Sequence, residues 1–279
     1  MKVRLLLLAF ATLMIAMTTN VFSQVDEAEA DPLTPGVTKS AIYLGPVFGY
    51  NRSLHTADLA SFADDPLCPF FQNGTANGFY VGLSYEHHIG NIKNSRHSVI
   101  GRVLYNSMPA SFTKEGDVYP SLVDIQGRDT TVYSSTKHSI DVAYSMITAE
   151  VMYKFIVIPG MGLGLTIGPT FDFPMTKTLN QKYQLIEPLN FQFKRVENWE
   201  QLGYKYEDFD RTIIVQDGDI DEASGFRMAI KLGVQYELYF KKFYVVPAIY
   251  YNFALTKVTS AEDWKVNALQ IGVDVRFAL

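Results

Sequence analysis

Residues 226–238 read FRMAIKLGVQYEL and alternate between two kinds of side chain. One parity, from Phe226 to Leu238, is large and apolar. The other parity carries all the charge of the run, at Arg227, Lys231 and Glu237. Successive side chains of a β-strand point to opposite faces, so this pattern predicts a strand with one apolar and one polar face.

Seven further runs alternate in the same way, and none carries a charge on its apolar parity; the run over 99–106 is the least regular. The eight predicted strands cover residues 41–51, 79–86, 99–106, 142–155, 163–173, 226–238, 243–253 and 268–277. No linker rich in proline, serine or charge divides them. The pattern predicts an all-β fold in one domain, residues 40–279.

Two placements of the apolar face are physically possible. A soluble barrel of lipocalin type points it inward, whereas a membrane barrel points it at lipid and fills its interior with polar and small residues. The polar parity holds many glycines and these ionisable residues: Glu86, Arg102, Glu150, Lys154, Asp172, Arg227, Lys231, Glu237, Asp274 and Arg276. We interpret that set as a crowded, ion-paired interior. Aromatic residues near the ends of the apolar faces also favour lipid, since girdles of membrane barrels lie there.

The connections between the predicted strands alternate in length. Three are long, over 54–77, 113–137 and 177–223, and three are short, over 90–97, 156–160 and 240–243. Long extracellular loops and short periplasmic turns are typical of outer-membrane barrels. The alternation predicts a closed antiparallel transmembrane β-barrel with both termini in the periplasm. Eight strands satisfy this; ten are an alternative, because 191–196 and 212–216 could form another hairpin, which we expect to stand above the membrane as an extension.

The first residues predict export. Lys2 and Arg4 precede an apolar run, and small residues around Ser23 suit cleavage, so residues 1–23 are predicted to be a signal peptide. Residues 24–39 are acidic and contain proline, which is typical of a disordered leader, here periplasmic. The apolar run is too short for a spanning helix. Cys68 is the only cysteine, so an internal disulfide is excluded.

The last strand carries a recognisable pattern. Residues 270–277, QIGVDVRF, resemble the C-terminal β-signal of outer-membrane barrels, although Ala278 and Leu279 follow the aromatic that usually ends the chain. The residues LY at 104–105 and AEVMYKF at 149–155 resemble the OmpA-like and PorT-like outer-membrane β-barrel domain families. The resemblance implies a fold, a location in a Gram-negative cell envelope and recognition by the barrel-insertion machinery. It assigns no site, and we expect no peptidoglycan-binding domain after the barrel.

Two functions follow from the predicted interior. The first is a structural or surface-interaction role, in which a filled barrel displays its long loops to a surface or envelope partner. The second is a narrow channel for small solutes. About eight strands leave room only for side chains, and five tyrosines on the polar parity favour the filled barrel: Tyr43, Tyr80, Tyr144, Tyr244 and Tyr250. The net charge of −5 gives no basic patch for nucleic acid.

Candidate metal sites are weak. Asp217, Asp219 and Asp221 alternate like the start of a calcium loop, but Glu222 stands where that loop needs glycine and Met228 where it needs glutamate. A second candidate set, in the first long loop, lacks zinc-type spacing: His55, Asp58 and Cys68. We therefore expect no metal and no cofactor.

Catalytic candidates are equally weak. Glu86, His87 and His88 lie at a strand end, where a histidine pair is more typical of an interface or turn than of a ligand set. The sequence offers no recognisable Ser/His/Asp arrangement. We expect no enzymatic activity, and an outer-membrane enzyme is the third hypothesis.

One interior contact is predicted in detail. Counted from the short turns, Glu86, Arg102 and Glu150 lie at similar depths on three neighbouring strands. We expect Arg102 to bridge the two glutamates, with Lys154 nearby to balance the charge.

Overall fold

The computed structural model describes residues 41–60, 70–90, 95–125, 128–158, 162–240 and 243–279. These residues belong to one compact unit, Lys39–Leu279. The predicted signal peptide, the leader and Cys68 lie outside the described residues. The described residues contain no helix long and apolar enough to cross a bilayer.

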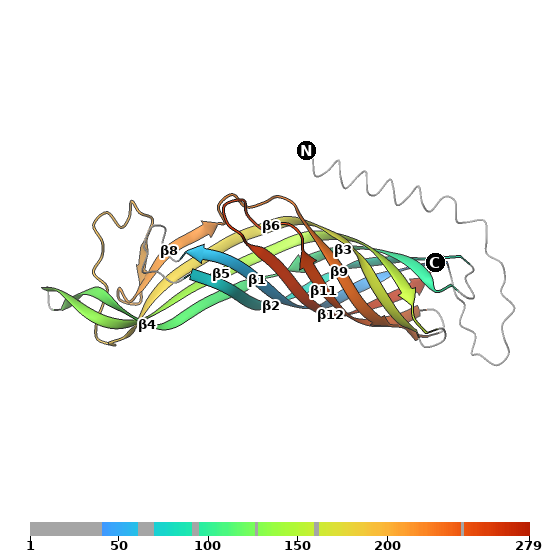
Figure 1. The fold of residues 1–279 in the computed structure, drawn as a ribbon, viewed down its shortest axis with the longest axis horizontal. Helices are drawn as coiled ribbons and strands as arrows, with labels where there is room; N and C mark the ends of the chain where they lie inside the picture. Colours follow the sequence, from blue (N-terminus) through green and yellow to red (C-terminus); the bar gives the residue numbers. More distant parts are fainter. Residues whose placement is uncertain (1–40, 61–69, 91–94, 126–127, 159–161, 241–242) are drawn as a thin grey trace. The chain divides into compact units, whose positions relative to one another are not determined.

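Eight antiparallel strands pair in a closed ring (Figure 1). The ring runs in the order β5, β3, β2, β1, β12, β11, β9 and β6, and the β5–β6 pairing closes it. The strands are β1 (Ile42–Ala60), β2 (Phe70–Ile89), β3 (His97–Ser107), β5 (Arg128–Ile156), β6 (Leu163–Glu187), β9 (Arg227–Tyr236), β11 (Phe243–Ala254) and β12 (Lys265–Ala278). The prediction of a closed eight-stranded barrel is confirmed.

Four further strands lie outside the ring. They are β4 (Ala110–Ile125), β7 (Lys205–Glu207), β8 (Thr212–Asp219) and β10 (Leu238–Tyr239). β4 pairs with the first half of β5, β8 pairs with the last third of β6, and β7 pairs with β8. β4, β7 and β8 extend β5 and β6 into a sheet, β4-β5-β6-β8-β7, that projects beyond the ring (Figure 1), whereas β10 pairs with β11. We call this the loop-end sheet, and the opposite end of the barrel, with the short connections, the turn end.

The loop-end sheet corrects the prediction of three long loops. β1 and β2 continue into 54–77, and 113–137 is a hairpin of β4 and β5. Within 177–223, residues 212–216 belong to β8, as the proposed extension required, but residues 191–196 do not form a strand. These stretches lack the apolar parity from which the lipid-facing strands were predicted.

The two faces of the ring strands are as predicted. The apolar parity is exposed on the outside; on β9, for example, Ile230, Leu232 and Val234 point outward, while Lys231 and Gln235 are buried inside. Aromatic residues border this belt, with Phe171, Phe173 and Phe226 packed together on the loop-end side. An apolar exterior around a charged interior is the arrangement of a transmembrane barrel of the outer-membrane type.

The C-terminal strand closes the ring against the first strand. β12 pairs with β1 from Tyr43 opposite Ala278 to Thr56 opposite Lys265. Within the predicted β-signal, Gln270, Asp274 and Arg276 are buried inside the barrel, and Ile271 and Phe277 face outward.

Candidate functional site

The barrel interior holds a balanced set of buried charges. Ten carboxylate, lysine and arginine side chains of the described residues are buried there, five acids and five bases: Glu86, Glu150, Asp172, Glu237, Asp274, Arg102, Lys154, Arg227, Lys231 and Arg276. All ten were on the polar parity of the sequence. Burial of an unpaired charge is very costly, so a lumen of this composition requires specific pairing.

Eight of these side chains form one chain of ion pairs with alternating sign. In order, its members are Glu237, Lys154, Glu86, Arg276, Asp274, Arg102, Glu150 and Lys231. The chain joins residues of β2, β3, β5, β9 and β12 with Glu237 beside β10. It therefore crosses the lumen rather than following the wall. Arg227 and Asp172 form a separate pair at 3.0 Å, and the carboxylate also accepts a hydrogen bond from Thr148.

The four residues of the predicted network all belong to this chain, but with different partners. Arg102 lies 3.6 Å from Glu150 and makes its shorter contact, 2.7 Å, with Asp274. The predicted bridge from Arg102 to Glu86 is wrong, because Glu86 pairs with Lys154 and Arg276. The prediction compared the depths of residues on neighbouring strands only, whereas the long Arg102 side chain reaches a residue across the lumen. Asp274 and Arg276 were visible in the sequence as polar-parity residues.

Tyrosine side chains fill the remaining width of the lumen. All five predicted interior tyrosines are buried: Tyr43, Tyr80, Tyr144, Tyr244 and Tyr250. Tyr244 donates to Glu86, and Arg102 donates to the hydroxyl of Tyr250 at 2.6 Å. The Arg102 guanidinium also lies 4.8 Å from the centre of the Tyr250 ring. Tyr244 and Tyr250 are therefore part of the charge network as well as steric filling.

Three side chains of β1 hydrogen-bond to the backbone at the corner where the chain leaves β3 of the ring and enters β4. The described ladder between β2 and β3 ends at Tyr80 and Asn106, just before Pro109 interrupts the strand. Asn51 donates to the carbonyl oxygen of Ser107 at 3.0 Å, and Ser53 donates to that of Pro109. Three successive inward residues of β1 thus satisfy this backbone, since His55 contacts the Met108 carbonyl oxygen at 3.0 Å.

Small residues on β2 make this reach possible. Opposite Asn51, Ser53 and His55 stand Gly78, Ala76 and Gly74. A Cβ atom at position 78 would lie 2.0 Å from the carbonyl oxygen of Ser107. The β1 side chains can therefore pass over β2 only because the facing positions carry almost no side chain.

His55 packs within a buried apolar cluster and does not belong to a metal site. The indole nitrogen of Trp264 donates to Nδ1 of His55 at 3.0 Å; because the indole can only donate, Nε2 of His55 carries the proton that bonds Met108. Both ring nitrogens are therefore occupied. Phe112, Tyr144 and Trp264 surround the ring within a buried apolar cluster. The expectation that His55 lies in the first long loop is wrong, because it belongs to β1, and Cys68 lies outside the described residues.

In the acidic run over 217–222, Asp217 is also bonded to other side chains of the protein. Asp217 lies 2.9 Å from Lys205 Nζ and accepts a hydrogen bond from Asn180 at 3.1 Å. The bond from Lys205 holds the pKa of Asp217 below its ordinary value. Across the described part of the chain, no group of three His, Cys, Asp or Glu residues is placed to hold a metal ion.

The histidine pair lies at the turn end of β2. The His88 ring packs edge-on against Tyr43, with 5.5 Å between ring centres. Glu86 of the same run points into the lumen network.

A single arginine organises the connection after β6. Arg211 donates to five backbone carbonyl oxygens, those of Leu185, Ile186, Pro188, Leu189 and Phe191. Leu185, Phe193 and Ile213 form a small buried core beside it, covered by Tyr183 and Tyr206. The connection is consequently a packed structure, which no pattern in the sequence signalled.

Three consecutive residues before Arg211 have positive φ angles. They are Asp208 at 53°, Phe209 at 56° and Asp210 at 59°. Asp208 accepts a hydrogen bond from Thr212, and Asp210 pairs with Arg195 at 2.8 Å. Residues other than glycine rarely adopt this left-handed backbone conformation unless their surroundings impose it. The turn leaves Phe209 88% exposed.

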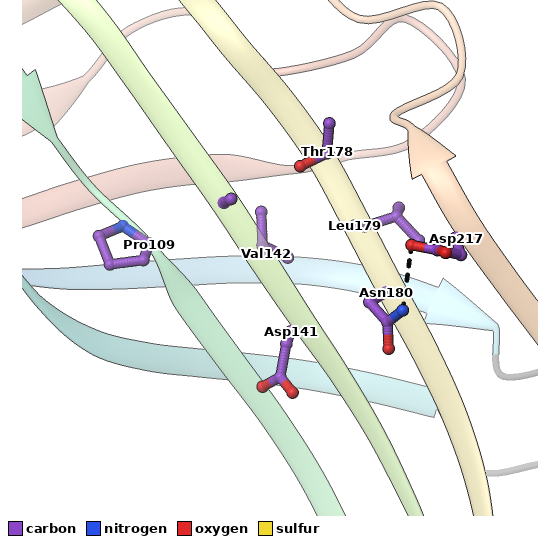
Figure 2. A pocket seen from close by; sticks show the side chains of 8 residues that line it. Pro109, Asp141, Val142, Thr178, Leu179, Asn180 and Asp217 are labelled. Carbon is purple, nitrogen blue, oxygen red and sulfur yellow. Dashed lines mark hydrogen bonds between the residues drawn. The ribbon is translucent and has the colours of Figure 1, made fainter. Parts of the chain in front are cut away.

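A pocket of about 290 Å³ opens at the base of the loop-end sheet (Figure 2). Pro109 lines one side, and residues of β5, β6 and β8 line the rest: Asp141, Val142, Ala143, Thr178, Leu179, Asn180 and Asp217. The pocket lies at the junction where β4 has left the ring and β8 has joined β6.

Comparisons with known proteins give only distant likenesses. No family model and no curated protein matches the chain. Among solved structures, similar ones include Ail, the attachment invasion locus protein of Yersinia pestis, at 13% identity over 86% of this chain and 100% of that chain, with a TM-score of 0.33. Neisserial surface protein A matches at 13% identity over 86% and 98%, with a TM-score of 0.35.

The outer membrane protein OprG from Pseudomonas aeruginosa matches at 12% identity over 88% of this chain and 99% of that chain, with a TM-score of 0.37. At such values these likenesses carry no inference about the role of this chain.

Proposed function

We propose that the protein is a non-conducting outer-membrane barrel that presents its loop-end sheet at the cell surface as a binding platform. The ring serves as the anchor, and the loop-end sheet with the packed connection 188–211 carries the interaction.

The observation that supports a closed lumen is the continuous chain of ion pairs across it. Arg102, Glu150, Lys154 and Glu86 are buried, and each is engaged by opposite charge. An ion passing this level must break several pairs, each buried in a medium of low dielectric constant. Tyr80, which is also buried, narrows the same region from β2.

The observation that supports a binding role is the regular, hydrogen-bonded structure of the loop end. Strands β4, β7 and β8 are paired there, Arg211 ties five carbonyl oxygens, and a strained turn displays Phe209. A preorganised surface loses less conformational entropy on binding than flexible loops do. The structure of the loop end is therefore suited to recognition.

Conductance in planar bilayers tests the closed lumen. We expect no steady current from the wild-type barrel, whereas Tyr250→Ala combined with Arg102→Ala should open a measurable conductance. The lipid-facing change Ile249→Ala on the same strand is the matched control and should remain silent. A steady wild-type current would contradict the proposal.

The narrow-channel alternative has one observation in its favour. Several buried polar side chains of the lumen have no hydrogen-bond partner among the described residues, including Gln235 and Asn252. Such groups commonly bind water. A hydrated path along them would pass small solutes, and the same conductance measurement decides between the two functions.

The orientation belongs to the proposal. We place the loop end outside the cell and both termini in the periplasm, with β12 as the strand read by the barrel-insertion machinery. In a Cys68→Ser background, Glu200→Cys on the exposed connection should react with a membrane-impermeant thiol reagent on intact cells. Labelling only after the outer membrane is broken would reverse the orientation. The proposal includes no catalysis, no cofactor and no nucleic acid.

A further inference from the structure

One sector of the outer wall carries positive charge just beyond the apolar belt, on its loop-end side. In this sector β12, β1 and β2 lie side by side (Figure 1), with Lys265 on β12 and Arg52 on β1. Arg52 alternates with the buried Asn51 and Ser53, and Lys265 precedes the buried Val266, so both side chains point away from the lumen. The other lysines and arginines of the described ring strands lie inside the lumen or on β5 and β6.

Arg52 marks the level at which outward side chains change from apolar to polar. On its turn-end side, Tyr50 of β1 and Phe79 of β2 are exposed members of the apolar belt. Beside and beyond it on β2, the outward residues are Asn77 and Thr75. Aromatic side chains of membrane proteins lie at the level of the lipid headgroups. Arg52 therefore lies where headgroups meet the barrel wall.

The Arg52 side chain is held in place by neutral partners. Its Nη1 atom donates to Oδ1 of Asn77 at 2.6 Å, and its Nη2 atom donates to Oγ1 of Thr75 at 2.7 Å. The hydroxyl of Tyr50 donates to the same Asn77 oxygen at 2.6 Å. A base that only reaches for water extends its charged head away from the wall. The Arg52 guanidinium is instead fixed against the outer face of β2.

The charge of this sector has no counter-ion in the protein. Arginine has five N–H groups, and two of those of Arg52 are used, which leaves three for a ligand. Neither Arg52 nor Lys265 forms an ion pair with a residue that the structure describes. The exposed acid on the same face of β1 is Asp58, six residues from Arg52 and so about 20 Å along the strand.

We propose that this sector binds the phosphate groups of a membrane lipid, with Arg52 as the principal ligand and Lys265 as the second charge. The acyl chains of the same lipid lie against Tyr50 and Phe79. The planar fork of arginine matches phosphate oxygens, and its strength rises beside the low dielectric of lipid. The inference goes beyond the surface role; the proposed orientation decides only the leaflet, which is the outer one with its phosphorylated glycolipid.

The spacing of the two charges favours a lipid over a free phosphate ion. Lys265 is the ladder partner of Thr56, four residues beyond Arg52, so the two positions are roughly 13 Å apart along the strand. Two charges at this separation suit a headgroup that carries more than one phosphate. A soluble polyanion would gain nothing from the exposed apolar side chains beneath Arg52, whereas a lipid covers them.

The test uses diphosphorylated lipid A as the probe and the whole barrel released from detergent, with bound lipid measured by native mass spectrometry. We expect saturable binding that weakens at least about fivefold in Arg52→Gln, which is the effect of one basic residue at an anionic lipid surface. Lys265→Gln should also weaken it. Arg128→Gln makes the same change at an exposed position of β5 in the loop-end sheet and should leave the affinity unchanged. Heat-modifiable migration on gels shows whether each variant has folded.

Two comparison ligands separate the contributions of phosphate and acyl chains. Lipid A without its phosphates should bind at least about fivefold more weakly, and so should the phosphorylated disaccharide without acyl chains. Equal binding of the dephosphorylated lipid, or unchanged affinity in Arg52→Gln, would overturn the inference. Equal binding of the deacylated disaccharide would show a site for soluble polyanions and would overturn the assignment to lipid. These measurements are made in detergent, so they stand apart from the thiol labelling that tests the orientation and from the conductance measurement.

Discussion

The guanidinium of Arg102 on β3 reaches Asp274 on β12, with 2.7 Å between Nη2 and Oδ2. β2 and β1 lie between these strands in the wall. The contact therefore spans the lumen and not a cross-strand neighbour position. Asp274 is shared with Arg276, which in turn pairs with Glu86, so one carboxylate connects the two halves of the charge network.

Double-mutant cycles measure this connection. Breaking a buried ion pair by removing one partner costs about 3–5 kcal/mol. We expect Arg102→Met with Asp274→Asn to show a clear coupling energy in urea unfolding followed by the fluorescence of the two tryptophans. Arg102→Met with Glu150→Gln should show a smaller coupling, since that pair is 3.6 Å apart and Glu150 keeps Lys231. A coupling near zero for the first pair would indicate charges solvated independently.

The lipid-facing belt predicts position-dependent tolerance to charge. Ile230 lies on the exposed face of β9, so Ile230→Arg should cost about 2–4 kcal/mol if its depth is near the midplane. Leu202→Arg makes the same kind of change on the exposed connection outside the belt and should cost little. Folding efficiency into lipid vesicles, read as heat-modifiable migration, gives the comparison. Equal loss at both positions would contradict the assignment of the belt.

The seam where β1 side chains pass over β2 to the β3–β4 corner predicts that residue 78 must be glycine. In Gly78→Ala the new methyl group would meet the Ser107 carbonyl oxygen at 2.0 Å, so β2 or the β3–β4 corner must move. We expect loss of the Asn51 hydrogen bond and a lower unfolding midpoint. At Gly218 a Cβ meets nothing within 4 Å, so Gly218→Ala is the matched control and should be neutral. Identical midpoints for the two variants would refute the role of the seam.

The Arg211 clamp predicts local loosening without loss of the barrel. Lysine cannot reproduce the fork that serves five carbonyl oxygens, so Arg211→Lys should expose residues 185–191 to protease. Arg128→Lys, at an exposed position of β5, is the control. Limited proteolysis with mass spectrometry should find new cuts only in the clamp variant, while heat-modifiable migration stays normal. Cuts at equal rates in both variants would exclude the clamp.

The Lys205–Asp217 contact predicts a response to acid. The hydrogen bond from Lys205 lowers the pKa of Asp217, so the ionised carboxylate and its contribution are fully present above the ordinary pKa of aspartate, about 3.9. The contribution is lost as the pH falls through the lowered value. NMR signals of the Asp217 side chain should therefore titrate below the ordinary pKa of an aspartate. Titration of Asp217 above its ordinary value would contradict this contact.

The strands and their faces could be read from the sequence. Alternation has a period of two residues, and lipid tolerates no charge on one face, so runs such as 226–238 record both strand and orientation locally. The same reasoning identified all ten buried charges and the five interior tyrosines. In contrast, residues 113–137 carry no such pattern, and their pairing as β4 and β5 was missed.

The ion-pair partners of the interior charges could not be read from the sequence in this way. Strand neighbours follow from the order of hairpins, but Arg102 bonds Asp274 across a closed ring, and ring closure brings together residues 172 positions apart. Arg211 likewise meets five carbonyl oxygens only after β6, β8 and the connection between them have packed. A local pattern fixes which side of a strand a residue occupies, because that depends on backbone geometry alone; which group it meets depends on how far its side chain reaches once every other strand is in place.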